Sequence, residues 1–312
     1  MPFTEETRLL DLGFSAVRGK DEMKLIRAVD ELGKLGLELA VHYPERDPEK
    51  AISCIQTLGE AAAVCNMKAG LLDAAVFLGK IGQEAAAKGD DEAVFRAAVA
   101  LTALGKEAAD QKMHVPFRLV ASSLKEVGKE AARQGMEKVA IASQAFLMEL
   151  GTCCEKWDFE AFRADIPSLI RDVGKCAASA RLEKAVISAE LLLEKAQLAL
   201  NGVILNSGRS SITERRICRE TCTPLHCLGE LGKVSCQRKL GLASVQASRS
   251  LEVVRKDAEA GYLGSTVLFA ESLLDSFGDV KISSPELDWT VKEIRNMQAE
   301  VTFQEKGIIG KL

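Results

Sequence analysis

Residues 122–151 read SSLKEVGKEAARQGMEKVAIASQAFLMELG, and this stretch carries the pattern that decides the fold. It is rich in Ala, Leu, Glu and Lys, which are strong helix formers. Gly128 nevertheless lies inside it, and Gly151 follows 23 residues later in the same local setting. The same spacing recurs along most of the chain.

Glycine marks one position in each 23-residue repeat. Leu or Ile stands four residues before most of these glycines, an aliphatic residue stands directly before each, and small pairs such as Ala131 and Ala132 follow. These offsets describe one apolar helix face, so we expect the glycine to lie on the buried side of a helix. The repeated glycines are Gly13, Gly36, Gly59, Gly82, Gly105, Gly128, Gly151 and Gly174.

A glycine inside a helix costs about 1 kcal/mol relative to alanine, so the repeated glycines need a compensating contact. We expect close packing to supply it, with a larger Leu or Ile of the next helix filling the groove beside each glycine. The alternative is that the glycines only end the helices. Helix-forming residues continue beyond them, as in KEAA after Gly128, which disfavours this alternative.

Turn signals recur at a second fixed phase, about seven to ten residues after each glycine. Each repeat is therefore predicted to be one helix and one short turn, and two repeats form a 46-residue helical hairpin. We expect an all-α chain of about 12 to 13 antiparallel helices. The turn signals include Gly19-Lys20, Tyr43-Pro44, Gly89-Asp90, His114-Val115-Pro116, Gly135 and Trp157-Asp158.

This one-helix repeat resembles the α-solenoids of the HEAT/armadillo-like superfamily in architecture, over nearly the whole chain. No family-specific motif accompanies the resemblance. It implies a right-handed, elongated and curved stack in which each repeat contacts its neighbours.

The repeat is interrupted once. Gly232 follows the expected position 197 by 35 residues, which is one repeat plus 12, and the pattern then continues to Gly278. We therefore expect helical repeats over residues 1–202 and 232–312, continuous with each other, with an insertion and a cysteine-containing segment at 203–231.

The composition of the chain indicates its cellular compartment and excludes some classes of partner. The net charge is −4, and the 41 basic and 45 acidic residues are interspersed, so no global field favours nucleic acid or an anionic membrane. The N-terminus MPFTEETRLL lacks the features of a signal peptide, no apolar run is long enough to span a bilayer, and the nine cysteines form no disulfide framework. We expect a cytoplasmic protein with no membrane partner.

Four candidate metal ligands gather in the segment that breaks the repeat: Cys218, Cys222, His226 and Cys227. Such soft or borderline ligands suit zinc or part of an iron–sulfur cluster. The spacing matches no strong metal signature, and neighbouring His226 and Cys227 are difficult to direct at one ion. Thiols packed between helices are the favoured interpretation, without a cofactor, and a metal-binding or redox-responsive protein is the alternative.

Two further features could contact a partner. Trp157 belongs to an aromatic group in an aromatic-poor chain, and the interrupting segment also carries four arginines, which suit phosphate or other anions. A core position for the tryptophan and a solvated helix face for the arginines are the simpler interpretations. The four arginines are Arg209, Arg215, Arg216 and Arg219.

The sequence contains no phosphate-binding, dinucleotide-binding, zinc-protease or nucleophile-elbow motif. We therefore predict a non-catalytic scaffold or adaptor that binds a protein partner through an extended helical surface. Nucleic-acid binding through the arginines is a third hypothesis, which the acidic total charge disfavours.

Overall fold

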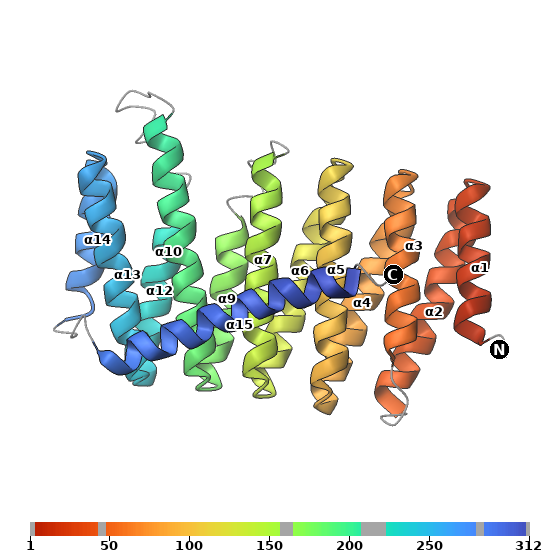
Figure 1. The fold of residues 1–312 in the computed structure, drawn as a ribbon, viewed down its shortest axis with the longest axis horizontal. Helices are drawn as coiled ribbons and strands as arrows, with labels where there is room; N and C mark the ends of the chain where they lie inside the picture. Colours follow the sequence, from red (N-terminus) through yellow and green to blue (C-terminus); the bar gives the residue numbers. More distant parts are fainter. Residues whose placement is uncertain (1–3, 43–47, 157–164, 207–222, 279–283, 310–312) are drawn as a thin grey trace. The chain divides into compact units, whose positions relative to one another are not determined.

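The computed structural model describes residues 4–42, 48–156, 165–206, 223–278 and 284–309 (Figure 1). These residues form thirteen α-helices and no strand, which confirms the predicted all-α fold. Contacts divide the chain into two compact units, Met1–Arg163 and Ala164–Leu312. Among the described helices, none combines the length and hydrophobicity needed to cross a bilayer.

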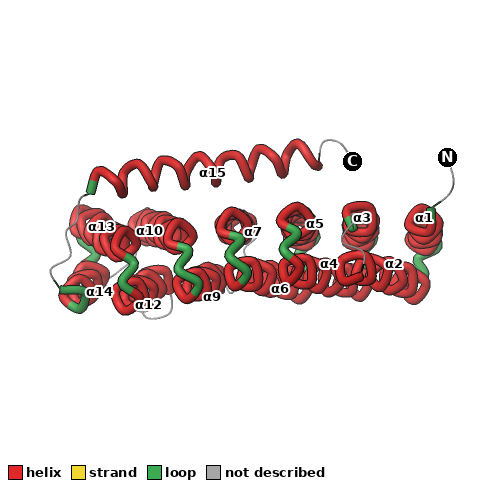
Figure 2. The backbone as a smooth tube through the Cα atoms, turned by 90° about the horizontal axis from the view of Figure 1, so that it is seen from below, coloured by secondary structure: helices red, strands yellow, loops and turns green. Residues whose placement is uncertain are grey.

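The first unit is a two-layer stack of antiparallel helices. Figure 2 shows α1, α3, α5 and α7 in one layer and α2, α4 and α6 in the other. Each helix therefore packs on its neighbours in sequence across the layers and on the helix after next within its own layer. The bounds are α1 (Glu5–Arg18), α2 (Glu22–His42), α3 (Glu49–Val64), α4 (Lys68–Lys88), α5 (Asp91–Asp110), α6 (His114–Arg133) and α7 (Glu137–Lys156).

The second unit repeats this arrangement and adds one helix that does not follow it. In Figure 2, α10 and α13 form one layer, α9, α12 and α14 form the other, and α15 lies across the outer side of α10 and α13. The bounds are α9 (Asp165–Ser179), α10 (Glu183–Asn206), α12 (Thr223–Arg238), α13 (Gly241–Ala260), α14 (Gly264–Asp275) and α15 (Pro285–Ile309).

The repeated glycines lie on the buried side of their helices, as predicted, but their main partner differs from the prediction. A Cβ on Gly59 would lie 2.7 Å from Leu104 Cδ2, on the helix after next in the same layer. The next helix in sequence contributes only the small Ala74, whose Cβ would lie 3.0 Å away. Each glycine thus lets two helices of one layer approach closely. The same pairing joins Gly13 to Leu58, Gly36 to Ile81, Gly82 to Val127 and Gly105 to Leu150.

The second unit contains the same contact with a longer sequence separation. Gly174 faces Leu231, 57 positions later, whereas Gly59 and Leu104 are 45 positions apart. The additional 12 positions equal the length of the interruption counted in the sequence. The domain boundaries predicted at 203 and 231 stay a prediction, because residues 207–222 lie outside the described part and the described flanks belong to α10 and α12.

The described turns are two or three residues long and recur in phase with the glycines. Where the structure describes the residue seven positions after a repeat glycine, its backbone is left-handed, as at Asn66, Gly89 and Lys239. The N–H of the following residue then bonds back across the helix end, as Leu240 N does to Ser235 O at 3.0 Å. This is the Schellman arrangement, which ends one helix and begins the next without a loop.

Two details of the predicted pattern were wrong. His114 and Pro116 do not form a turn, because they belong to the first turn of α6, where Pro is tolerated. Gly278 is not inside a helix, because α14 ends at Asp275 and Gly278 has a φ of +71°. The regular repeat therefore ends before α15.

The left-handed turn position offers a test of this account. Lys239 holds a φ of 58°, which costs a non-glycine residue about 1 kcal/mol. We expect Lys239→Gly to raise the free energy of unfolding by about 0.5 kcal/mol, measured by urea denaturation. Lys233→Gly, inside α12, is the matched control and should lower it by about 1 kcal/mol. Equal losses in both variants would contradict the turn geometry.

Candidate functional site

Most of the residues proposed from the sequence lie outside the described part of the structure. This holds for Trp157, for Cys218 and Cys222, and for the four arginines. Their proposed roles in metal or partner binding stay predictions. The four arginines are Arg209, Arg215, Arg216 and Arg219.

The two described members of the proposed metal cluster differ in their surroundings. His226 is exposed on α12, where its ring stacks on Phe269 with centroids 6.4 Å apart. Cys227 is fully buried, and its Sγ lies 3.9 Å from Ser168 Oγ on α9. Burial raises the pKa of the Cys227 thiol, although Arg171 and Ser168 oppose this effect. Within the described residues, no three potential ligands converge on a metal position.

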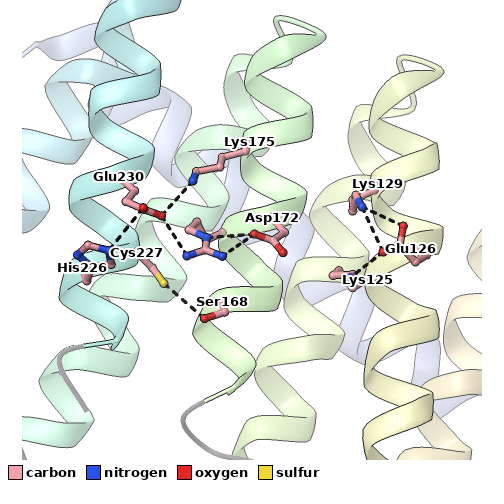
Figure 3. Close-up of polar contacts among 10 residues, drawn as sticks. Lys125, Glu126, Lys129, Ser168, Asp172, Lys175, His226, Cys227 and Glu230 are labelled. Atoms are coloured by element: carbon pink, nitrogen blue, oxygen red, sulfur yellow. Dashed lines mark hydrogen bonds and ion pairs between the residues drawn. The ribbon is translucent and has the colours of Figure 1, made fainter. Parts of the chain in front are cut away.

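A cluster of charged side chains joins α9 to α12 on the side of these helices that carries His226 (Figure 3). Glu230 accepts hydrogen bonds from Arg171 Nη1 and Lys175 Nζ, both at 3.0 Å, and Arg171 also donates to Asp172. Burial alone would raise the pKa of Glu230, but the Lys175 hydrogen bond and the two cations hold it below its usual value. Two cations face two carboxylates, so the cluster connects neighbouring helices and leaves no net charge for a ligand.

A row of polar side chains between α10 and α13 extends from the exposed Asp257 to buried positions, and the sequence did not predict it. Asn201 Nδ2 donates to Asp257 Oδ2 at 2.9 Å, and Ser250 Oγ donates to Glu194 Oε2 at 2.5 Å. Glu190 is fully buried and accepts a hydrogen bond from Ser235 Oγ of α12 at 3.1 Å. The second unit therefore has a core that is partly polar.

The register of these helices predicts that two unsatisfied oxygens lie opposite each other. Both bonded pairs between α10 and α13, Asn201 with Asp257 and Glu194 with Ser250, are separated by 56 residues in sequence. Glu190 and Gln246 have the same separation. Glu190 Oε2 and Gln246 Oε1 are both buried without a hydrogen-bond partner. A proton on Glu190 would supply the donor that this pair needs.

Burial raises the pKa of Glu190 well above its usual value, since the hydrogen bond from Ser235 opposes the shift only in part. The sequence did contain a signal for this residue. Glu190 occupies the repeat position that holds Val29, Ile52 and Ala75 in the first unit, and each of these is buried. A carboxyl group at an apolar repeat position predicts a buried acid.

The outer face of α10 and α13 carries a helix. α15 buries an apolar stripe against this face, and the stripe has the spacing of a helix side. Figure 2 shows α15 crossing both helices rather than stacking beside them as a further repeat. The buried stripe consists of Leu287, Val291 and Ile294.

Three polar contacts accompany the stripe. Arg249 Nη1 of α13 lies 2.5 Å from Asp288 Oδ1, and Lys184 Nζ of α10 lies 2.7 Å from Glu293 Oε1. Near the middle, Gln298 Nε2 donates to Ser188 Oγ at 3.0 Å. In both of these ion pairs the basic group belongs to the layer and the acidic group to α15.

The face below α15 is built from uncharged segments. Residues 185–189 of α10 and 241–248 of α13 contain no charged side chain. A run of this length covers all sides of a helix, so its outward side is uncharged too. The other layer carries charged side chains at mid-helix, Arg171 and Asp172 on α9 and Glu230 on α12, although residues 166–170 and 223–229 of these helices also lack Asp, Glu, Lys and Arg. The layer of α10 and α13 is the one that carries α15.

Comparisons with known proteins add little to this description. No protein-family model matches the sequence, and no curated protein matches it. One solved structure is similar, described as a circular tandem repeat protein with novel repeat topology and enhanced subunit contact surfaces. It shares 14% sequence identity with a TM-score of 0.46, over 95% of this chain and 72% of that one.

The raised pKa of Glu190 predicts an unusual pH dependence of stability. Its folded pKa lies above the unfolded value of about 4.5, so its contribution to stability is present below that pH and is lost as the pH rises. Glu190→Gln keeps the acceptor for Ser235 and gives Gln246 a donor. We expect this variant to gain stability over the wild type as the pH is raised from 4.5, by about 1 kcal/mol for each unit of pKa shift.

Glu252→Gln is the matched control, because Arg255 lowers the pKa of Glu252 to about 2. The stability that Glu252 contributes is present above pH 4.5 and is lost as the pH falls. The Glu252→Gln variant should therefore have a lower free energy of unfolding than the wild type at neutral pH. Urea denaturation between pH 4.5 and 8.5 measures both. Parallel curves for wild type and Glu190→Gln would contradict the buried acid.

Proposed function

We propose that this chain is a non-catalytic scaffold that binds protein partners through the outer face of the layer containing α10 and α13. Helical repeat arrays supply extended surfaces of this kind. The cytoplasmic location expected from the composition stays a prediction.

One observation carries this proposal: the face already carries an amphipathic helix, α15. Its apolar stripe and its polar contacts to Lys184, Ser188 and Arg249 show that the surface accepts a helix along its length. Recognition of an amphipathic helix by an apolar surface is a common mode of protein binding.

The first unit contains the same kind of segment in the equivalent layer. Residues 51–59 of α3, 97–105 of α5 and 139–148 of α7 contain no charged side chain. The other layer has shorter uncharged runs, 74–79 of α4 and 119–124 of α6, beside the charged Asp73, Lys125 and Glu126. Long uncharged segments in the layer of α3, α5 and α7 are therefore a property that the first unit shares with α10 and α13.

The proposal is tested with a trans peptide. In the full chain, Leu287→Asp with Ile294→Asp removes the apolar stripe of α15 and opens the face. We expect a fluorescent peptide of residues 285–301, with the natural sequence, to bind this opened chain saturably, measured by fluorescence anisotropy. Ser188→Arg in the opened chain should weaken binding at least tenfold, because Ser188 lies under the helix.

The matched control is Ser179→Arg at the exposed end of α9, which should leave binding unchanged. Circular dichroism and urea denaturation establish that each variant is folded. If the opened chain is folded and the peptide does not bind, the proposed function is wrong. A milder opening variant, Ile294→Ser, provides the same comparison if the double variant does not fold.

A further inference from the structure

We infer that α15 is a displaceable occupant of its own chain's binding face, and that the partner is an amphipathic helix with an acidic edge, which must compete with α15. This inference rests on the proposed function and specifies the partner and its regulation. Three observations on α15 carry it.

The first observation is that α15 takes no part in the repeated contacts between helices of one layer. The repeated contacts end with Gly232, whose added Cβ would meet Ala247 at 2.8 Å and the ring of Phe277. Both partners precede α15 in the chain, and α15 crosses α10 and α13 instead of continuing a layer. Releasing α15 therefore leaves the contacts at the glycines of the second unit intact.

The second observation concerns how α15 is held. Its ion pairs are exposed, with Asp288 at 63% and Glu293 at 53% relative accessibility, and exposed pairs contribute little to stability. The side of α15 away from the array carries polar residues and Trp289, which is 79% exposed. The apolar stripe therefore supplies most of the attachment, and a second helix with an equal stripe can replace it.

The third observation is charge complementarity. The rim of the face presents Arg249 on α13 and Lys184 on α10, and α15 meets them with Asp288 and Glu293. Arg295 of α15 also interacts with the half-buried Glu194, whose pKa is raised by burial and lowered in part by the Ser250 hydrogen bond and by Arg295 and Arg249. Opposite charges across an interface select partners and suppress wrong ones.

These positions define the partner helix. Counting Leu287 as i, apolar side chains stand at i, i+4 and i+7, and acidic side chains at i+1 and i+6. A partner with this pattern gains the same buried stripe and the same two ion pairs. Because α15 is tethered beside the face, its effective concentration is high, and the partner must overcome it.

The experiment uses the peptide of residues 285–301 and compares the wild-type chain with the opened chain, Leu287→Asp/Ile294→Asp. We expect the wild type to bind the peptide at least tenfold more weakly, because α15 competes with it. Equal affinity for both chains would overturn the competition. Absence of binding to the folded, opened chain would instead overturn the proposed function, so the two failures are distinguishable.

Charge reversal tests the acidic edge. In the opened chain, Lys184→Glu with Arg249→Glu should weaken binding of the natural peptide about tenfold. A peptide with Asp288→Lys and Glu293→Lys should bind this reversed chain better than the natural peptide does. Affinities that do not change with either reversal would show that the charge of the partner does not contribute to binding at this face.

A second copy of the chain is the remaining occupant to test. If α15 occupied the face of another molecule, the wild type would form concentration-dependent dimers, and the opened chain would remain monomeric. Light scattering after size-exclusion chromatography measures this. We expect a wild-type mass that does not change with concentration, and dimers would overturn the intramolecular assignment.

Discussion

The structure depends on one missing side chain per repeat. At six of the repeated glycines, an aliphatic residue of the helix after next occupies the space that a Cβ would fill, as Leu104 does at Gly59 and Leu150 does at Gly105. This contact brings the helices of one layer together, while small residues such as Ala74 keep the neighbouring layer close. Dense packing at these points recovers the cost of placing glycine in a helix.

The periodic glycines and turn signals were sufficient to predict helices, their antiparallel order and the buried side of each. They could not identify the main partner of each glycine, because a repeat of 23 residues is compatible with contacts to either neighbour. Two or three residues of turn reverse the chain, so consecutive helices fall in different layers and equal positions align only two repeats later. The reversal depends on residues with a left-handed backbone, such as Asn66 and Lys239. The identity of these side chains does not predict that conformation.

The candidate site was harder to predict from the sequence than the fold was. The cysteines and arginines of the interrupting segment are chemically distinctive, whereas the face under α15 consists of uncharged segments of a kind that also occurs elsewhere in these helices. Glu190 could have been found from its apolar repeat position, but its relation to Gln246 requires the register between α10 and α13. The docking of α15 was hidden because its apolar spacing is that of any amphipathic helix, and Gly278 continued the glycine series into a turn.

The most direct measurement of the central claim is a double-mutant cycle between Gly59 and Leu104, using urea denaturation of the full chain. Gly59→Ala introduces a Cβ 2.7 Å from Leu104 Cδ2, and Leu104→Ala removes the obstruction. The close approach predicts that the double variant is less destabilised than the sum of the single variants, by about 1 kcal/mol or more. Additive effects, within about 0.5 kcal/mol, would contradict the contact on which the stack is built.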